Sequence, residues 1–157
     1  MKRFAVMVSC VVVLGAASAM AAASGDAIIL SPEKVKFTDA PQFGPGAQVA
    51  VLAGDPAKAG PYVVRLKLPS GSAVGAHTHS DAENVTVISG SLALGLGETP
   101  DKAKAQELGP GAFFLMPAQT PHYAWTTAET VVQIHGMGPS ETKMLEASGS
   151  SEPHEHH

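Results

Sequence analysis

The chain has 157 residues, 45% of them hydrophobic, and its ten basic and fourteen acidic side chains give a formal net charge of −4. This length suffices for one domain and little more. The acidic balance argues against nucleic acid and anionic membrane surfaces as partners, because both are bound through basic patches.

Residues 1–23 predict a secretory signal peptide. Lys2 and Arg3 form a basic start, and the apolar run at residues 4–17 is too short to span a bilayer comfortably. Small residues in Ala-x-Ala patterns follow, so cleavage is expected between about residues 19 and 24. The mature protein would then be secreted or periplasmic, without a membrane association. An uncleaved membrane anchor is the alternative. Cleavage would also remove Cys10, the single cysteine, which excludes disulfides and thiolate ligands.

Residues 24–48 are rich in proline and glycine, and we expect an N-terminal arm there that adds one or two strands and covers a sheet edge. Short apolar runs then recur between turn residues up to residue 139. This pattern is typical of an all-β antiparallel barrel or sandwich, a jelly roll of one domain. The expected strands are residues 62–68, 75–79, 84–89, 91–96, 104–108, 112–116, 120–126 and 130–135.

The last segment, residues 140–157, differs from the rest in composition. A helix of about two turns is expected at 140–147, after Pro139. The remaining residues are small and polar, which predicts a flexible, disordered tail.

Three histidines and one glutamate have spacings that could bring them to one point. Successive side chains on a strand point to opposite faces, so His77 and His79 point the same way. Glu83 follows a polar bend, and His122 lies far along the chain, so the fold must bring it in. Glycines and a proline frame both groups, in the patterns Gly71-x5-His77-x-His79-x3-Glu83-x6-Gly90 and Gly111-x5-Pro117-x4-His122.

The side chains of His77, His79, Glu83 and His122 predict a site for one divalent metal ion. Imidazole binds Fe, Mn, Ni, Co and Zn, and a carboxylate shifts the preference toward the harder ions, so Fe or Mn is favoured. Four protein ligands around an octahedral ion leave positions for substrate, water or dioxygen, as catalytic metal sites require. The alternative is a polar histidine cluster without a metal.

The two patterns resemble the sequence motifs of the cupin superfamily, which read G-x5-H-x-H-x3-4-E-x6-G and G-x5-P-x-G-x2-H-x3-N. The first motif is matched at every fixed position. The second departs from the family at Gln119 and Thr126, where Gly and Asn are usual. The resemblance covers residues 49–139 and implies a cupin-type β-barrel. It also implies a homodimer, because cupin-like barrels commonly pair through sheet edges.

Gln133 and His135 are candidate catalytic residues on the last predicted strand. They share one face, and if that face is the barrel interior they would line the pocket as hydrogen-bond donors or a proton shuttle. The alternative is a face toward solvent or a partner subunit. Val131 shares their face, while Val132 and Ile134 share the other, so alternation leaves both interpretations open.

The resemblance implies metal-assisted chemistry on a small molecule. Oxygen-dependent oxidation with Fe(II) is the first hypothesis, followed by decarboxylation or lyase chemistry with Mn(II). A non-catalytic module that holds a metal or a small ligand is the alternative of a different class. Arg65 could bind a substrate carboxylate, although Lys67 on the same face favours solvent.

Overall fold

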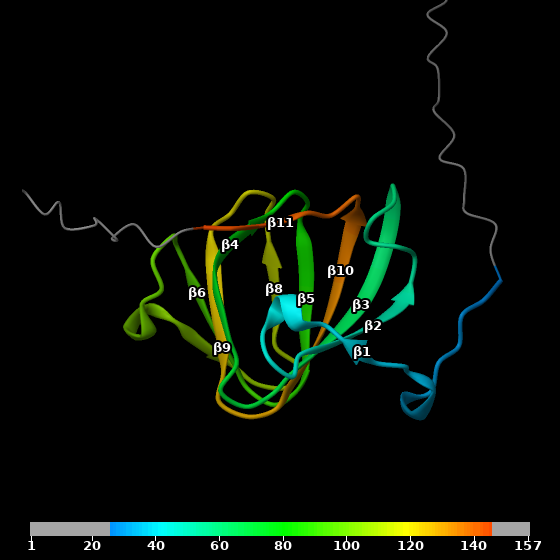
Figure 1. Ribbon diagram of the computed structural model, residues 1–157, viewed down its shortest axis with the longest axis horizontal. Coiled ribbons are helices and arrows are strands. Elements are labelled where there is room, and N and C mark those ends of the chain that lie inside the picture. The colour runs from blue at the N-terminus through cyan, green and yellow to red at the C-terminus, as the bar shows by residue number, and fades with distance from the viewer. Residues whose placement is uncertain (1–25, 146–157) are drawn as a thin grey trace, which may run out of the picture.

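The computed structural model describes residues 26–145 and shows two antiparallel sheets (Figure 1). The predicted signal peptide and the part of the predicted tail beyond residue 145 lie outside the described residues. Three short 3₁₀ turns accompany the strands, at η1 (Pro32–Lys34), η2 (Pro41–Phe43) and η3 (Lys102–Lys104). Within residues 26–145, no helix is long and apolar enough to cross a membrane. The all-β fold predicted from the turn spacing is confirmed.

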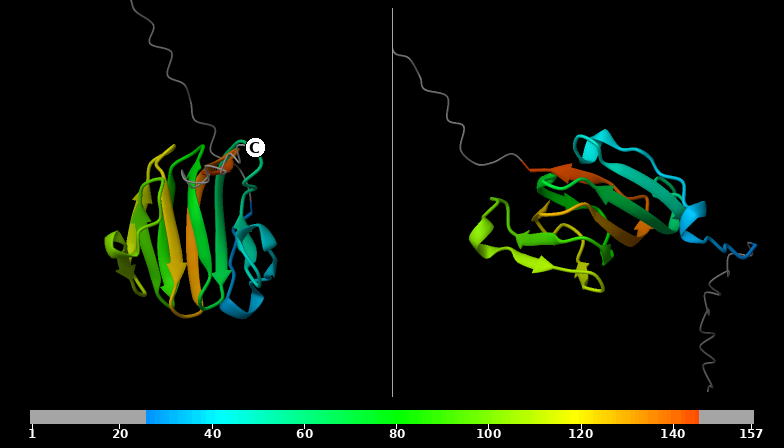
Figure 2. Two further views of the ribbon diagram at one scale, coloured as in Figure 1. Left: turned by 60° about the vertical axis from the view of Figure 1, so that its left-hand side comes forward. Right: turned by 90° about the horizontal axis from the view of Figure 1, so that it is seen from below.

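The two sheets face each other as layers of a jelly roll (Figure 2). One sheet has the order β1 (Thr38–Asp39), β2 (Gln48–Ala53), β3 (Gly60–Leu68), β10 (Thr130–Gly138), β5 (Glu83–Ser89) and β8 (Phe113–Met116). The other has the order β11 (Thr142–Met144), β4 (Ala73–His79), β9 (His122–Thr126), β6 (Leu92–Leu96) and β7 (Gln106–Leu108).

Strand β3 shows how alternation assigns the two faces of a sheet. Val64 and Leu66 are buried between the sheets, whereas Arg65 and Lys67 lie on the outer face. The apolar core forms where the inner faces of both sheets meet. Its buried members are Ala47, Leu66, Leu68, Val85, Val87, Leu92 and Val132.

The helix expected at residues 140–147 is wrong for the described part of that segment, because Thr142–Met144 forms strand β11 and residues 146 and 147 lie outside the described residues. This strand pairs antiparallel with β4, with Thr142 opposite His79 and Met144 opposite His77. A helix of about two turns has too few hydrogen bonds to offset its nucleation cost. The open edge of β4 offers a ready ladder of backbone donors and acceptors instead.

The turn between β5 and β6 explains one glycine of the first motif. Gly90 has a φ of 84°, in the left-handed region that favours glycine. A Cβ at this position would also collide with the carbonyl oxygen of Glu129 and with the side chain of Thr130. The turn therefore requires a residue without a side chain.

We expect Gly90→Ala to lower the free energy of unfolding by about 2–4 kcal/mol, because strain and overlap add. Urea denaturation measures the change. The matched control is Gly109→Ala, where an added Cβ would meet no atom within 4 Å and the change should stay within about 0.5 kcal/mol. Equal losses in the two variants would contradict this account.

Candidate metal centre

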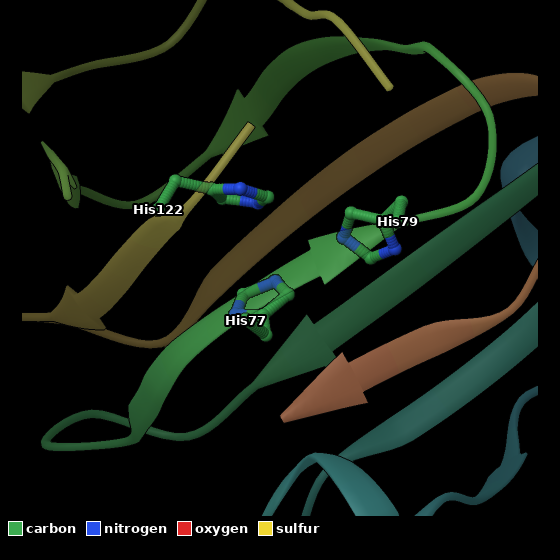
Figure 3. Close-up of side chains that lie close together, drawn as sticks. All are labelled: His77, His79 and His122. Atoms are coloured by element: carbon green, nitrogen blue, oxygen red, sulfur yellow. The ribbon is translucent and has the colours of Figure 1, made fainter. Parts of the chain in front are cut away.

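Strands β4 and β9 bring three histidines together between the sheets. His77 and His79 lie two residues apart on β4, and His122, the first residue of β9, pairs directly with His77. One ring nitrogen from each of the three lies within 4.8 Å of those of the others. Figure 3 shows the three rings grouped in this way. All three side chains are buried.

Backbone carbonyls orient two of these rings. Nδ1 of His77 lies 2.7 Å from the carbonyl oxygen of Gly75, and Nδ1 of His122 lies 2.9 Å from that of Thr120. Since a carbonyl only accepts, these contacts assign the proton to Nδ1 in both rings and leave Nε2 with a free lone pair. Metal-binding histidines are held in this way in proteins generally.

His79 is held by side chains from two other strands. Its Nδ1 lies 3.1 Å from Oγ1 of Thr142 on β11, and its Nε2 lies 3.2 Å from Oε2 of Glu83, the first residue of β5. Glu83 is buried beside the three histidines but contacts the group through His79. The structure thus brings all four predicted ligands to one region, and the set whose donor atoms all lie within 4.8 Å of one another consists of the three histidines.

Burial sets the protonation of the site. It lowers the pKa of all three imidazoles, that of His79 to about 4, helped by the neighbouring His77 and His122. Burial also raises the pKa of Glu83 to about 7, and the negative charge of Asp81 adds to this. These shifts favour neutral partners in the His79–Glu83 contact over an ion pair. Neutral imidazoles with free lone pairs are what a divalent cation binds, so the donor set fits a metal ion.

Asp81 is a supporting residue that the sequence did not single out. It lies in the bend between β4 and β5, between His79 and Glu83. Its Oδ2 accepts hydrogen bonds from the Tyr62 hydroxyl (3.2 Å) and the Met137 backbone N–H (3.0 Å), and its Oδ1 accepts from the Ser140 hydroxyl (2.6 Å). This carboxylate ties the ligand-bearing bend to β3, to β10 and to the segment before β11.

Gln119 stands where the family motif usually has glycine, and it adopts the left-handed backbone conformation that glycine favours. It has a φ of 61°, in the left-handed region, at the third position of the turn that begins at Pro117. Its backbone N–H and its side-chain Nε2 both donate to the carbonyl oxygen of His79, at 2.9 and 3.0 Å. The glutamine thus links the second motif to a histidine of the first.

The interpretation of Gln133 and His135 as pocket residues requires a correction. Val132 and Ile134 of β10 line the cavity between the sheets, so the alternating Gln133 and His135 lie on the outer face. There Gln133 Oε1 accepts a hydrogen bond from Nε of Arg65 (2.9 Å), and its Nε2 lies 2.9 Å from Nε2 of His135. The hydrogen bonds of Gln133 and His135 on this outer face thus do not reach the three histidines.

The histidines lie in the wall of a cavity of ≈ 330 Å³ between the two sheets. All four predicted ligands line it, together with the Tyr62, Ser140 and Thr142 side chains. A metal ion held there would thus face an internal space large enough for a small molecule.

Comparisons with known proteins agree with this architecture. The Cupin domain family profile matches residues 64–135. Among solved structures, KdgF from a Halomonas species superposes with a TM-score of 0.56 at 21% identity, covering 68% of this chain and 91% of its own. A structure from a study of the DMSP lyases RdDddP and RnDddQII gives 0.57 at 22%, covering 72% and 63%. The salicylate 1,2-dioxygenase from Pseudoaminobacter salicylatoxidans with gentisate gives 0.55 at 15%, covering 65% and 30%. No match is found among curated proteins.

At these identities the solved structures show the fold alone. The molecule is a jelly roll of two antiparallel sheets with an internal histidine group able to hold a metal ion. The Cupin domain family profile matches residues 64–135, the stretch that carries the three histidines and the glutamate, so this part of the chain is a cupin domain.

We expect Thr142→Val to weaken Co(II) or Zn(II) binding about 10- to 100-fold, because the ring of His79 loses the hydroxyl that orients it. Competition with a chelating dye measures the affinity. Thr127→Val, on the exposed turn between β9 and β10, is the control and should leave it unchanged. Equal affinities in the two variants would show that Thr142 does not position His79.

A pair of substitutions separates the two contributions of Gln119. Gln119→Ala and Gln119→Gly both lose the side-chain hydrogen bond, but only alanine keeps a Cβ in the left-handed conformation. The alanine variant should be less stable than the glycine variant by about 1 kcal/mol in urea denaturation. An alanine variant as stable as the glycine variant would refute the left-handed turn.

Proposed function

We propose that this protein is a secreted or periplasmic mononuclear metal enzyme that oxidises a small molecule with dioxygen. One divalent ion, Fe(II) in preference to Mn(II), would be bound by His77, His79 and His122. Glu83 would be the fourth ligand. The observation that carries the proposal is a set of three neutral, buried imidazoles grouped in the wall of a cavity. Export and a homodimeric state belong to the same proposal.

The chain's own residues would supply binding, orientation and exclusion of water. The carbonyls of Gly75 and Thr120 hold the rings of His77 and His122 with Nε2 available. A bound ion would supply Lewis acidity and, for iron, redox reactivity toward dioxygen. The anionic form of Glu83, which burial and the charge of Asp81 disfavour, would be stabilised by a cation. Apolar walls would keep bulk water away from the reacting molecule.

Tyr62 would act as a fixed hydrogen-bond donor at the histidine end of the cavity. Burial raises the pKa of its hydroxyl to about 12, so the phenol stays protonated at neutral pH. Its hydroxyl donates to Asp81, and the residue lines the cavity. This residue would therefore hold the ligand-bearing bend in place through Asp81, and would not act as a base.

The oxidative reaction has support from the resemblance and from one structural relative. A salicylate 1,2-dioxygenase is built on the same fold. A structure reported with the DMSP lyases RdDddP and RnDddQII shares the fold and suggests a reaction of another class. Lyase chemistry and non-catalytic binding are thus the outcomes against which oxidation must be tested.

The test begins with protein purified without an affinity tag. The predicted tail ends in His154-Glu155-His156-His157, which could bind metal by itself, so a His77→Ala, His122→Ala double variant with the same tail is the reference. We expect one more metal ion per chain in the parent protein than in this variant, measured by elemental analysis. Circular dichroism confirms that the variant is folded.

Oxygen uptake then separates the reactions. Fe(II)-loaded protein is incubated with a panel of small aromatic and aliphatic acids, alcohols and diols, and oxygen and substrate are followed together. Uptake by the parent protein but not by the double variant supports the proposal. Substrate loss without oxygen uptake would indicate a lyase, and bound metal without turnover would indicate a binding protein. Equal metal content in parent and variant would overturn the metal site itself.

A further inference from the structure

The cavity beside the histidines has walls of two kinds at its two ends. Its polar lining residues lie near the histidines. Tyr62 and Ser140 both donate to Asp81, and Thr142 contacts His79. Elsewhere the lining is almost wholly aliphatic or aromatic, with inner-face residues of both sheets such as Leu66 and Leu92. Gln42, an exposed residue of η2, is the polar exception.

No lysine or arginine of residues 26–145 lines this cavity. The two cations of β3 lie on the outer face of the sheet. Arg65 donates to Gln133 there, and Nζ of Lys67 lies 5.0 Å from the centre of the Phe37 ring. An anionic group held against the apolar lining would thus lose water contacts without gaining a counter-charge, which disfavours its binding.

The size of the cavity limits its occupant. A dry apolar cavity of about 150 Å³ holds benzene. A space of ≈ 330 Å³ is about twice as large, so it suits a molecule of about twelve non-hydrogen atoms. One substituted ring, or a chain of similar size, has that volume.

We infer that the substrate is a small molecule with a single oxygen-bearing head group and an apolar ring or chain as its body. The head group lies at the histidines and the body fills the apolar end, which accepts no second charged group. The placement of the head group rests on the proposed metal function, whereas the apolar body rests on the cavity alone.

Two isosteric probes test the inference on the full chain loaded with Co(II). Para-isopropylbenzoate and terephthalate have the same number of non-hydrogen atoms and differ in one substituent, isopropyl or carboxylate. Because the far substituent lies at the apolar end, para-isopropylbenzoate should bind at least about 100-fold more tightly in isothermal titration calorimetry. Equal affinities, or tighter binding of terephthalate, would overturn the inference.

Two neighbouring residues of β3 provide matched variants. Val64 lines the cavity and Val63 lies on the outer face. Val64→Phe should weaken binding of para-isopropylbenzoate at least about 10-fold by filling the space, and Val63→Phe should change it less than about 2-fold. Thermal melts confirm folding. Should Val64→Phe not fold, the probe pair on the parent protein still decides the question.

Para-isopropyltoluene, which has no head group, distinguishes this inference from the proposed function. It should bind the metal-free parent protein and bind Val64→Phe at least about 10-fold more weakly. If no metal binds while this hydrocarbon does, the metal function fails and the apolar cavity stands. If metal binds but the hydrocarbon does not, the substrate class is wrong and the metal function stands.

Discussion

Three imidazoles are buried between the sheets, where they lose most of their hydrogen bonds to water. The surrounding structure has to provide hydrogen-bond partners in place of that water. Each ring must find a partner from the protein. His77 and His122 use carbonyls two residues before them in the chain, at Gly75 and Thr120. Gly75 lies where the pairing of β4 and β9 shifts register, so an irregularity in the ladder provides the oxygen that orients the ring.

A second carboxylate, that of Asp81, supports the bend that carries two of the predicted ligands. Its three hydrogen bonds reach β3, β10 and the segment after Pro139, which fixes the bend that carries His79 and Glu83. Its negative charge also raises the pKa of both of these residues, although burial dominates in each. Gly136 belongs to this arrangement, because a Cβ there would collide with the Tyr62 hydroxyl and with Asp81.

The sequence predicts what depends on local periodicity and spacing. Alternation on β3 identifies the inner face correctly, and the motif spacing identifies the histidines that the structure brings together. It fails where the outcome depends on distant partners. The stretch Thr142–Met144 has no strand signal of its own and becomes β11 only because β4 has a free edge. The inner face of β10 could not be chosen, because apolar residues occur on both of its faces.

The side chains that support the histidines could not be predicted from the sequence, for the same reason. Asp81 and Thr142 have ordinary positions in the sequence, and their roles depend on contacts across strands that spacing does not encode. Gln119 stands out in the sequence as a departure from the family motif. Its two hydrogen bonds to the carbonyl oxygen of His79 are evident only in the structure.

Strand β11 changes what counts as the complete unit of this protein. The family profile ends at residue 135, yet Ser140 and Thr142, which support Asp81 and His79, come later in the chain. A gene trimmed to the boundaries of the family profile would encode all four predicted ligands, but it would lack Thr142, which orients His79, and Ser140, which binds Asp81. Engineering of shorter versions or carboxyl-terminal fusions should therefore keep the chain intact through Met144.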